Sequence, residues 1–503
     1  MSKLYKATKI FLFFILVFIL LGTAARITQR KESQRKYQDF MALADQVDVL
    51  FLGSSHVLNG INPVQLYREQ GITSYNMGKP GGMVTESYWM LMNALDYCTP
   101  KCVVVDLWAL DRDYRYVDVM NGYESEEELR NSVSLLHNNM DIWPLGRTKI
   151  AAVRDLIQDP QIRKEFLWDF TLYHDRWSAL GSDDFMALGG QLQSGYLLGA
   201  ERRPELYLDP SIGQADDTAQ VLPGKSVCVE YLEKILAVCE ERGIDVVLTF
   251  LPMARSYDQD RQAVNTATQI AQERGILFLN MLPHETQTLI DYYTDMSDDT
   301  HLNANGMRKM TSYIGAVLKD ACALPDHRAD TSYAAWEARV TKWQADEIDM
   351  LCSQQDLYAE LGAIQNINAS VVLYMRGDSK ALHDATVRRF VKQLTGSPVI
   401  DDAVSTNGPY LLIRDASGNI SDTPVSYEFA GETQTEKFAT LLGETEYIGM
   451  PDFGAVYVGG DYENNYLDME EHYGDEVQLL ILGQQGEVIG RLYYDAEWQG
   501  TEE

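Results

Sequence analysis

The chain has 503 residues, of which 46% are hydrophobic, and it carries a formal net charge of −32 at pH 7. This length allows two or three domains with apolar cores, and this composition excludes a largely disordered chain. The acidic balance excludes a typical nucleic-acid-binding protein, which needs a basic face for the phosphate backbone, so we expect no nucleic-acid partner. Much of the acidic excess lies at the C-terminal end, where residues 401–503 hold 22 Asp and Glu against 3 Lys and Arg.

The first 36 residues predict a membrane anchor. Ile10–Leu21 is an uninterrupted apolar run, extended by Gly22–Ala25 and flanked by basic residues on both sides. An uncleaved signal anchor is our preferred interpretation, and a cleaved signal peptide is the alternative. More basic residues follow the run than precede it, which by the positive-inside rule favours a cytosolic body. Because large domains translocate largely regardless of charge, we expect a single-pass protein of the cell membrane with an extracytoplasmic body.

Residues 37–324 alternate between strand-like and helix-like patterns. The expected strands are Val47–Gly53, Ile72–Asn76, Cys102–Leu107, Ile244–Leu251 and Ile276–Leu279. The expected helices are Gln34–Ala44, Met83–Cys98, Ser226–Arg242, Asp258–Arg274 and Asn303–Asp320. This alternation predicts an α/β fold with a doubly wound, flavodoxin-like parallel sheet. Residues 110–224 form a long insertion after the third strand, with helical patterns at Tyr123–Leu136 and Gln161–Leu180.

Two stretches at the expected carboxyl edge of this sheet carry chemistry. Gly53-Ser54-Ser55 ends the first strand, which is where an α/β fold exposes a nucleophilic hydroxyl, although an ordinary serine-capped turn gives the same pattern. A glycine-rich turn, NMGKPGG at residues 76–82, follows the second strand. The chain up to about Cys322 can be arranged around this edge.

A third stretch, Asp295–Gly306, reads DMSDDTHLNANG and follows the last expected strand. Asp298 precedes His301 by three residues, so its carboxylate can orient the imidazole from the same loop, as in a Ser–His–Asp arrangement. A bare D-x-x-H is common by chance, whereas D-x-x-H-L-N-x-x-G at the start of the last helix of the pattern is much more specific.

Together these stretches resemble blocks I, II and V of the SGNH (GDSL-like) hydrolases over roughly Asp48–Cys322. The resemblance implies that Ser55 is the nucleophile, His301 the general base and Asp298 the residue that orients the base. It also implies that backbone amides of Ser55 and Gly81 form the oxyanion hole. The Gly-Ser-Ser form is similar to that of membrane-anchored members that assist acyl transfer to cell-envelope polymers.

One block of the family is missing. Members carry Gly-x-Asn-Asp after the third strand, where this chain has DLWALD at residues 106–111, so Asp106 or Asp111 is the polar residue available there. The asparagine that completes the oxyanion hole is therefore absent or replaced, which puts strong free-standing hydrolase activity in doubt. The residues expected to contact the substrate are Ser54, His56, Asn76, Trp108, His174 and Arg176.

Neither a metal nor a cofactor is expected. The six cysteines form no CxxC pair, and no HExxH sequence occurs. We expect the cysteines to be small buried hydrophobic residues, with one or two disulfides as the alternative if the chain is exported.

The C-terminal part predicts a separate acidic α+β module at residues 334–503, after a polar linker at residues 325–333. We expect helices at Ala334–Tyr358 and Lys380–Leu394, a strand at Val371–Met375, and hairpins at Tyr410–Ile420 and Val477–Ile489. The hairpins share a short LLI-containing pattern, which fits either a duplication or ordinary hairpins. The acidic stretch Asp461–Glu476 is expected to be a solvated surface, with a calcium site as the alternative. We expect this module to bind glycan or a partner protein.

These observations favour a membrane-anchored serine esterase or acyltransferase, which moves an acyl group, acetyl in the simplest case, to or from a hydroxyl of a cell-envelope or secreted polysaccharide. The expected partners are the membrane, a multi-pass membrane protein that donates the acyl group, and the polysaccharide or another acceptor. The alternative is a catalytically degenerate SGNH scaffold that serves envelope assembly or glycan binding. A cytosolic lipase-like enzyme tethered to the inner leaflet follows from the charge count alone.

Overall fold

The computed structural model describes residues 2–29, 32–116, 135–168, 170–189, 197–208, 210, 212–282, 289–353, 356–425, 434–450, 453–460, 463, 466–468 and 476–494. The chain divides into two compact units. The sheet unit comprises Met1–Arg202, Gly213–Leu289 and Lys309–Arg339, and the tail unit comprises Arg203–Ile212, Ile290–Arg308 and Val340–Glu503.

A five-stranded parallel sheet forms the centre of the sheet unit. Its strands are β1 Val49–Leu52, β2 Ser74–Asn76, β3 Cys102–Asp106, β4 Asp245–Phe250 and β5 Leu277–Asn280. The order is β2-β1-β3-β4-β5, which is the flavodoxin-like order of doubly wound folds. Every residue of β1 and β3 is buried, as expected for central strands covered on both faces. The predicted parallel α/β sheet is confirmed.

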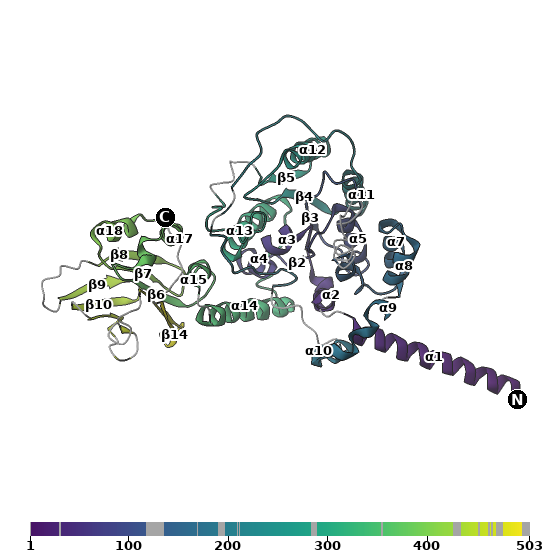
Figure 1. Ribbon diagram of the computed structural model, residues 1–503, viewed down its shortest axis with the longest axis horizontal. Coiled ribbons are helices and arrows are strands. Elements are labelled where there is room, and N and C mark those ends of the chain that lie inside the picture. The colour runs from purple at the N-terminus through teal and green to yellow at the C-terminus, as the bar shows by residue number, and fades with distance from the viewer. Residues whose placement is uncertain are drawn as a thin grey trace. The chain divides into compact units, whose positions relative to one another are not determined.

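Helices cover both faces of this sheet (Figure 1). They are α2 Glu32–Leu43, α3 Ser55–Gly60, α4 Pro63–Gln70, α5 Val84–Ala94, α11 Val227–Arg242, α12 Asp258–Arg274 and α13 Ala304–Ala321. On one face α5 packs against α11. On the other, α13 packs against α4, where a Cβ added to Gly315 would lie 2.5 Å from Leu66 Cδ1. The helices predicted for this domain outside the insertion are all present, with ends shifted by a few residues.

The N-terminal helix α1, Ser2–Thr28, is the one helix among the described residues that is long and apolar enough to cross a membrane. Its candidate span, Tyr5–Thr28, has a mean hydropathy of 2.6 and is not buried within the protein. It is therefore a candidate membrane anchor or signal sequence.

The described part of the insertion consists of short helices. They are α7 Arg147–Leu156, α8 Pro160–Leu167, α9 Phe170–Tyr173, the 3₁₀ helix η2 His174–Ala179, α10 Ser182–Met186 and the 3₁₀ helix η3 Ala187–Gly189. The helical pattern expected over Gln161–Leu180 is therefore present as three short helices, α8, α9 and η2. The backbone of Trp168 leaves the helical region, with φ −143° and ψ 70°, and ends α8 there. The helix expected over Tyr123–Leu136 lies mostly outside the described residues.

The tail unit contains two antiparallel sheets and a layer of helices. The strands are β6 Ser370–Met375, β7 Tyr410–Arg414, β8 Ile420–Pro424, β9 Gln434–Thr440, β10 Gly443–Met450, β11 Phe453–Val458, β12 Tyr466–Asp468, β13 Val477–Leu482 and β14 Val488–Tyr494. The helices include α14 Ala334–Ser353, α15 Leu357–Ala363, α16 Lys380–His383, α17 Ala385–Thr395 and α18 Val399–Thr406. One sheet has the order β14-β13-β6-β7-β8 and the other the order β12-β11-β10-β9.

Alternation along β6 builds the core of this unit. Val371, Leu373 and Met375 pack among the helices, whereas Val372 and Tyr374 pack with residues of the second sheet. The two predicted hairpins, β7–β8 and β13–β14, lie on either side of β6. The predicted α+β module is thus present, although most of the acidic stretch Asp461–Glu476 lies outside the described residues.

Two helices predicted for the tail are interrupted. The helix expected over Lys380–Leu394 consists of α16 and α17, because Asp384 ends the first and its carboxylate accepts a hydrogen bond from Val387 N, at 2.8 Å, at the start of the second. The helix expected over Ala334–Tyr358 ends at Ser353 in the same way, and α15 starts after a new cap at Asp356.

All six cysteines are free thiols, and five of them are buried, as predicted. Cys102 and Cys322 nevertheless lie together in the sheet unit, with their Sγ atoms 3.3 Å apart.

Candidate active site

The predicted nucleophile turn follows β1 directly. A Cβ added to Gly53 would lie 2.6 Å from the Val57 side chain and 2.8 Å from Asp106 Cβ, so only glycine fits between the strand ends and α3. The chain therefore turns sharply as it leaves the sheet.

The two serines of this turn have different environments. Ser54 is buried and caps α3, since its Oγ accepts a hydrogen bond from His56 N at 3.2 Å. We therefore assign Ser54 a structural role rather than the substrate contact expected from the sequence. Ser55 is the first residue of α3 and is only partly buried, so it stands at the carboxyl edge of the sheet, where the sequence predicts the nucleophile.

Asn76 holds the next turn in place. Its amide donates hydrogen bonds to the carbonyl oxygens of Val57 and Ile61 at 2.7 and 2.8 Å, and its Oδ1 accepts one from Gly78 N at 2.8 Å. The side chain is fully buried. Both amide hydrogens are thus used by backbone, so Asn76 ties the glycine-rich turn to α3 and is not a substrate contact.

The glycine-rich turn lies against the nucleophile turn. Gly82 N donates to Lys79 O at 3.1 Å, and the sequence Pro80-Gly81 with φ +61° at Gly81 is typical of a type II turn. A Cβ added to Gly82 would lie 2.6 Å from Gly53 O. The sheet unit therefore brings the turn that carries Gly81, the predicted oxyanion donor, beside the turn that carries Ser55.

Asp106 is the last residue of β3 and one of the two polar residues that the sequence offered in place of the missing block. Its Oδ1 accepts a hydrogen bond from Leu251 N at 3.1 Å, and its Cβ lies against Gly53. Burial raises the pKa of Asp106 to about 7, so the carboxyl group is partly protonated near neutral pH. This side chain holds the ends of β1, β3 and β4 together.

His56 and Trp108 form an aromatic pair next to the nucleophile turn. Their ring centroids are 5.2 Å apart, His56 is buried, and Trp108 is partly exposed beneath the Arg112 guanidinium. The predicted substrate contacts of these two residues remain predictions.

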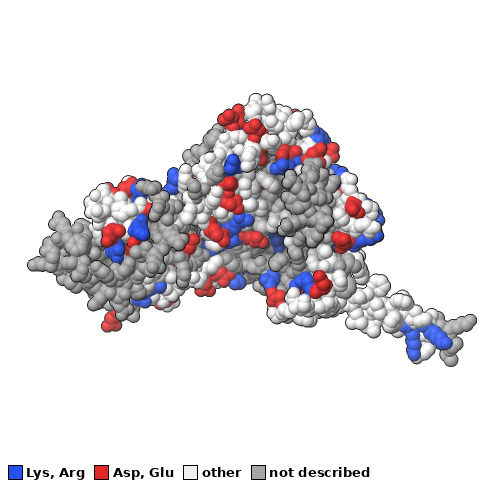
Figure 2. All heavy atoms as spheres, in the orientation of Figure 1, with Lys and Arg blue, Asp and Glu red and all other residues white. Residues whose placement is uncertain are grey.

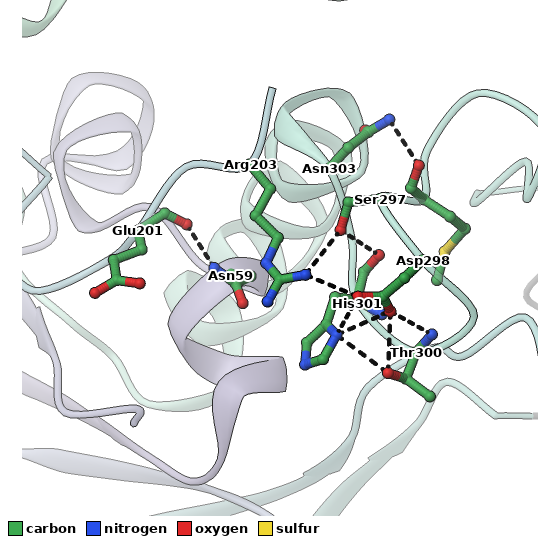
Figure 3. Close-up of polar contacts among 9 residues, drawn as sticks. Asn59, Glu201, Arg203, Ser297, Asp298, Thr300, His301 and Asn303 are labelled. Carbon is green, nitrogen blue, oxygen red and sulfur yellow. Dashed lines mark hydrogen bonds and ion pairs between the residues drawn. The ribbon is translucent and has the colours of Figure 1, made fainter. Parts of the chain in front are cut away.

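Asp298 and His301 form the predicted acid–base pair in the tail unit (Figure 3). Both carboxylate oxygens of Asp298 lie 2.8 Å from His301 Nδ1, and Oδ1 also accepts hydrogen bonds from the backbone amides of Thr300 and His301 at 2.9 Å. Burial alone would raise the pKa of Asp298, but these hydrogen bonds outweigh it and hold the pKa well below its usual value. Asp298 is therefore ionised at neutral pH and fixes the imidazole through Nδ1.

The remainder of the D-x-x-H-L-N-x-x-G motif builds the loop. Asn303 caps α13 by accepting hydrogen bonds from Asn305 N and Gly306 N, and its amide donates to the carbonyl oxygens of Thr294 and Met296. A Cβ added to Gly306 would lie 2.3 Å from Asp295 O. The motif thus encodes both the histidine and the cap that holds its loop on the helix.

The structure adds two residues that the sequence did not suggest. Arg203 Nη1 donates to Asp298 Oδ2 at 2.8 Å, and Thr300 Oγ1 lies 3.1 Å from both Asp298 Oδ1 and His301 Nδ1 (Figure 3). Thr300 is adjacent to the histidine and could have been proposed as a local partner. Arg203 lies far from Asp298 in the sequence, in a stretch without periodicity, so nothing in the sequence predicts that the two residues are in contact.

The two substrate contacts predicted in the insertion, Arg176 and His174, remain predictions. Arg176 donates from Nη1 to Thr28 O, the last carbonyl of α1, and to Gln29 O directly after it, and it pairs with Asp184 at 3.3 Å. It therefore fastens the insertion to the N-terminal helix. His174 is exposed on η2, next to Arg176.

A cavity of about 320 Å³ lies on the other side of the glycine-rich turn. Its lining residues include Lys36, Phe40, Leu58, Met77, Gly78, Pro80, Met90, Ile142, Trp143 and Glu201. The lining is mainly apolar, as is typical of small-molecule sites. Lys36 Nζ donates to Gly78 O there, and burial lowers the pKa of Lys36 to about 7.

The chain was compared with family models, curated proteins and solved structures. No family model and no curated protein matches the chain. Among solved structures it is similar to a proposed acylhydrolase from Bacteroides fragilis, with 10% identity and a TM-score of 0.28 over 57% of this chain and 95% of that one. It is also similar to the lipase/acylhydrolase from Enterococcus faecalis, with 11% identity and a TM-score of 0.26 over 56% and 98% of the two chains.

A third similar structure is a gut microbial diltiazem-metabolising enzyme, with 14% identity and a TM-score of 0.20 over 56% of this chain and 49% of that one. TM-scores this low carry no argument. The fold assignment therefore rests on the strand order, and the proposed function rests on the residues described above.

Proposed function

We propose that this protein is a membrane-anchored serine esterase or O-acyltransferase. The Asp298–His301 pair is the observation that carries the proposal. Asp298 binds His301 at Nδ1, which leaves Nε2 as the ring nitrogen that can take up a proton from a nucleophile. Ser55, at the first position of the helix after β1, is the nucleophile that we pair with it.

The proposed reaction has two steps. Ser55 Oγ attacks the carbonyl carbon of an ester while His301 takes the hydroxyl proton, and Asp298 stabilises the imidazolium. The tetrahedral oxyanion is held by the backbone amides of Ser55 and Gly81 and collapses to an acyl-serine as His301 returns the proton to the leaving alcohol. A second hydroxyl then attacks the acyl-serine, with the same proton transfers in reverse order.

The acceptor decides between the two activities. Water as the second hydroxyl makes the protein an esterase, and a sugar hydroxyl makes it an acyltransferase. We propose a short acyl group, acetyl in the simplest case, on a cell-envelope or secreted polysaccharide. Helix α1 supports a site near the membrane, where a multi-pass membrane protein can supply the acyl group. The apolar cavity behind Gly78 and Pro80 supports a small acyl substrate.

Labelling with a fluorophosphonate tests this proposal. The full-length protein in detergent should react, and Ser55→Ala and His301→Ala should both abolish labelling, because the first removes the nucleophile and the second its base. His383→Ala is a matched control, since His383 is an exposed histidine of α16 whose Nε2 lies 3.2 Å from Gly377 O and which has no part in the proposed chemistry. Labelling that survives in Ser55→Ala would show that another residue is the reactive one.

A non-catalytic scaffold for envelope assembly or glycan binding is the second candidate. It is favoured by Asp106, because the residue that replaces the family's third block has its Oδ1 bound to Leu251 N. The oxyanion hole then has two backbone donors and no side-chain donor, and losing one such donor typically costs about 3 kcal/mol of transition-state stabilisation. A folded wild-type protein that does not react with fluorophosphonate would favour this candidate.

A further inference from the structure

An unusual group of exposed apolar side chains lies on the insertion. Six large hydrophobic residues are between 39% and 55% exposed within a segment of about twenty residues: Trp168, Leu172, Trp177, Phe185, Met186 and Leu188. We call this group the apolar apron. In the rest of the described sheet unit outside α1, exposed large hydrophobic residues are scattered. Clustered exposure of this kind marks a protein or membrane contact.

The apron surrounds the C-terminal end of α1. The elements that carry most of it, α9, η2, α10 and η3, each contact α1, and Figure 1 shows α9 and α10 beside the end of that helix. Arg176 of η2 binds the carbonyl oxygens of Thr28 and Gln29, and Asp184 of α10 binds both Arg176 and Gly181 N. The segment is thus fastened to the helix by polar bonds that leave its large apolar side chains outside.

The length of α1 determines where its C-terminal end lies relative to the membrane. The apolar run Ile10–Leu21 lies at the middle of the span Tyr5–Thr28. Figure 2 shows the shaft of α1 without charged side chains and with basic groups at its N-terminal end. A hydrocarbon core of about 30 Å takes about 20 helical residues at 1.5 Å each. Centred on the apolar run, such a core ends near Ala25, so Thr28 and everything bound to it lie at the membrane surface.

We propose that the apolar apron lies in the interface of the lipid bilayer and forms a second membrane contact beside α1. This inference rests on α1 being the membrane anchor of the proposed function. Tryptophan, enriched in membrane interfaces, accounts for two of the six side chains. Short helices with apolar side chains on one side lie in the plane of the interface without crossing it. The apron prevents the sheet unit from pivoting on a single helix and fixes its orientation over the membrane.

Environment-sensitive labels test the inference in the full-length protein. Single cysteines are introduced as Trp177→Cys and Phe185→Cys in a Cys352→Ser background, because the other five native cysteines are buried. They are labelled with NBD after reconstitution into phosphatidylcholine nanodiscs with or without doxyl-labelled lipid. Tyr257→Cys is the matched control, since Tyr257 is 57% exposed against 55% for Trp177 but lies at the start of α12. Phe14→Cys on α1 reports insertion of the anchor.

We expect doxyl lipid to remove most of the NBD fluorescence at positions 177 and 185, with a blue-shifted emission, and to leave position 257 unchanged. Quenching at position 14 without quenching at 177 and 185 overturns the apron and keeps the anchor. It would indicate that a protein covers this surface instead. Absence of quenching at position 14 overturns both the anchor and the apron, while the fluorophosphonate assay of Ser55 tests the chemistry independently.

Discussion

Replacing Asp298 by asparagine is the sharpest test of the acid–base pair. The carboxylate lies 2.8 Å from His301 Nδ1 through both oxygens and accepts a further hydrogen bond from Arg203 at 2.8 Å. Asparagine keeps the shape of the side chain but removes its charge and places hydrogen-bond donors against a guanidinium group. The imidazolium that forms when Ser55 attacks then loses its counter-charge.

The expected loss can be estimated from this geometry. Two unit charges about 4 Å apart interact by about 4 kcal/mol at an effective dielectric constant of about 20. Solvent screens part of this, because the Asp298 and His301 side chains are 42% and 18% exposed. We therefore expect roughly 2 to 4 kcal/mol of lost transition-state stabilisation, which is about 30-fold to 1,000-fold in rate.

The assay is the second-order rate of fluorophosphonate labelling of the full-length protein near neutral pH. Asp299→Asn is the matched control, since Asp299 is the adjacent, partly buried aspartate and has no hydrogen bond to His301 among the described contacts. We expect the wild-type rate in this control. A wild-type rate in Asp298→Asn, or an equal loss in both variants, would refute the role that we give to Asp298.

Three further predictions concern stability and redox state. Burial raises the pKa of Glu360 in the tail unit to about 8, so the folded protein holds a proton that the unfolded chain releases, and stability falls as the pH rises from about 4.5 to about 8. Glu360→Gln should therefore be more stable than wild type above about pH 8, by an amount on the order of 5 kcal/mol. The difference in free energy of unfolding, measured in urea, should vanish near pH 4.5, and a pH-independent difference would contradict this. Gly306→Ala should lower the free energy of unfolding and slow fluorophosphonate labelling, because its Cβ would lie 2.3 Å from Asp295 O. An unfolding transition at the wild-type temperature in calorimetry would show that the loop can accommodate the added methyl group. Cys102 and Cys322, 3.3 Å apart at sulfur, should form a disulfide if the body is extracytoplasmic, so non-reducing peptide mapping of protein from membranes should find the linked pair; two free thiols would point to a reducing compartment.

The features that the sequence predicted well are those encoded locally. Gly53-Ser54-Ser55 and the Asp298–His301 loop combine a strand or helix boundary with residues that bond within a few positions, so a motif contains both partners. The alternation of buried strands with amphipathic helices likewise restricts the strand order to those of a few doubly wound folds.

The features that the sequence did not predict depend on contacts with residues far away in the chain. Arg203 binds Asp298 across 95 residues, and Arg176 binds carbonyl groups of α1 across almost 150 residues. An arginine carries the same local pattern whether it binds a substrate, a carboxylate or a helix end. The end of α8 at Trp168 has a similar origin. The helical pattern of the sequence continues past this residue, whereas the short helices that follow pack against α1, which is distant in the sequence.

Mapping the residue that carries a fluorophosphonate adduct is the most direct test of Ser55 as the activated nucleophile. The full-length protein is labelled in detergent, digested and sequenced by mass spectrometry. We expect one adduct, on the peptide that contains Ser54 and Ser55, with fragment ions that assign it to Ser55. The adduct should be absent from His301→Ala. An adduct on any other residue, or no adduct on folded protein, would contradict this assignment.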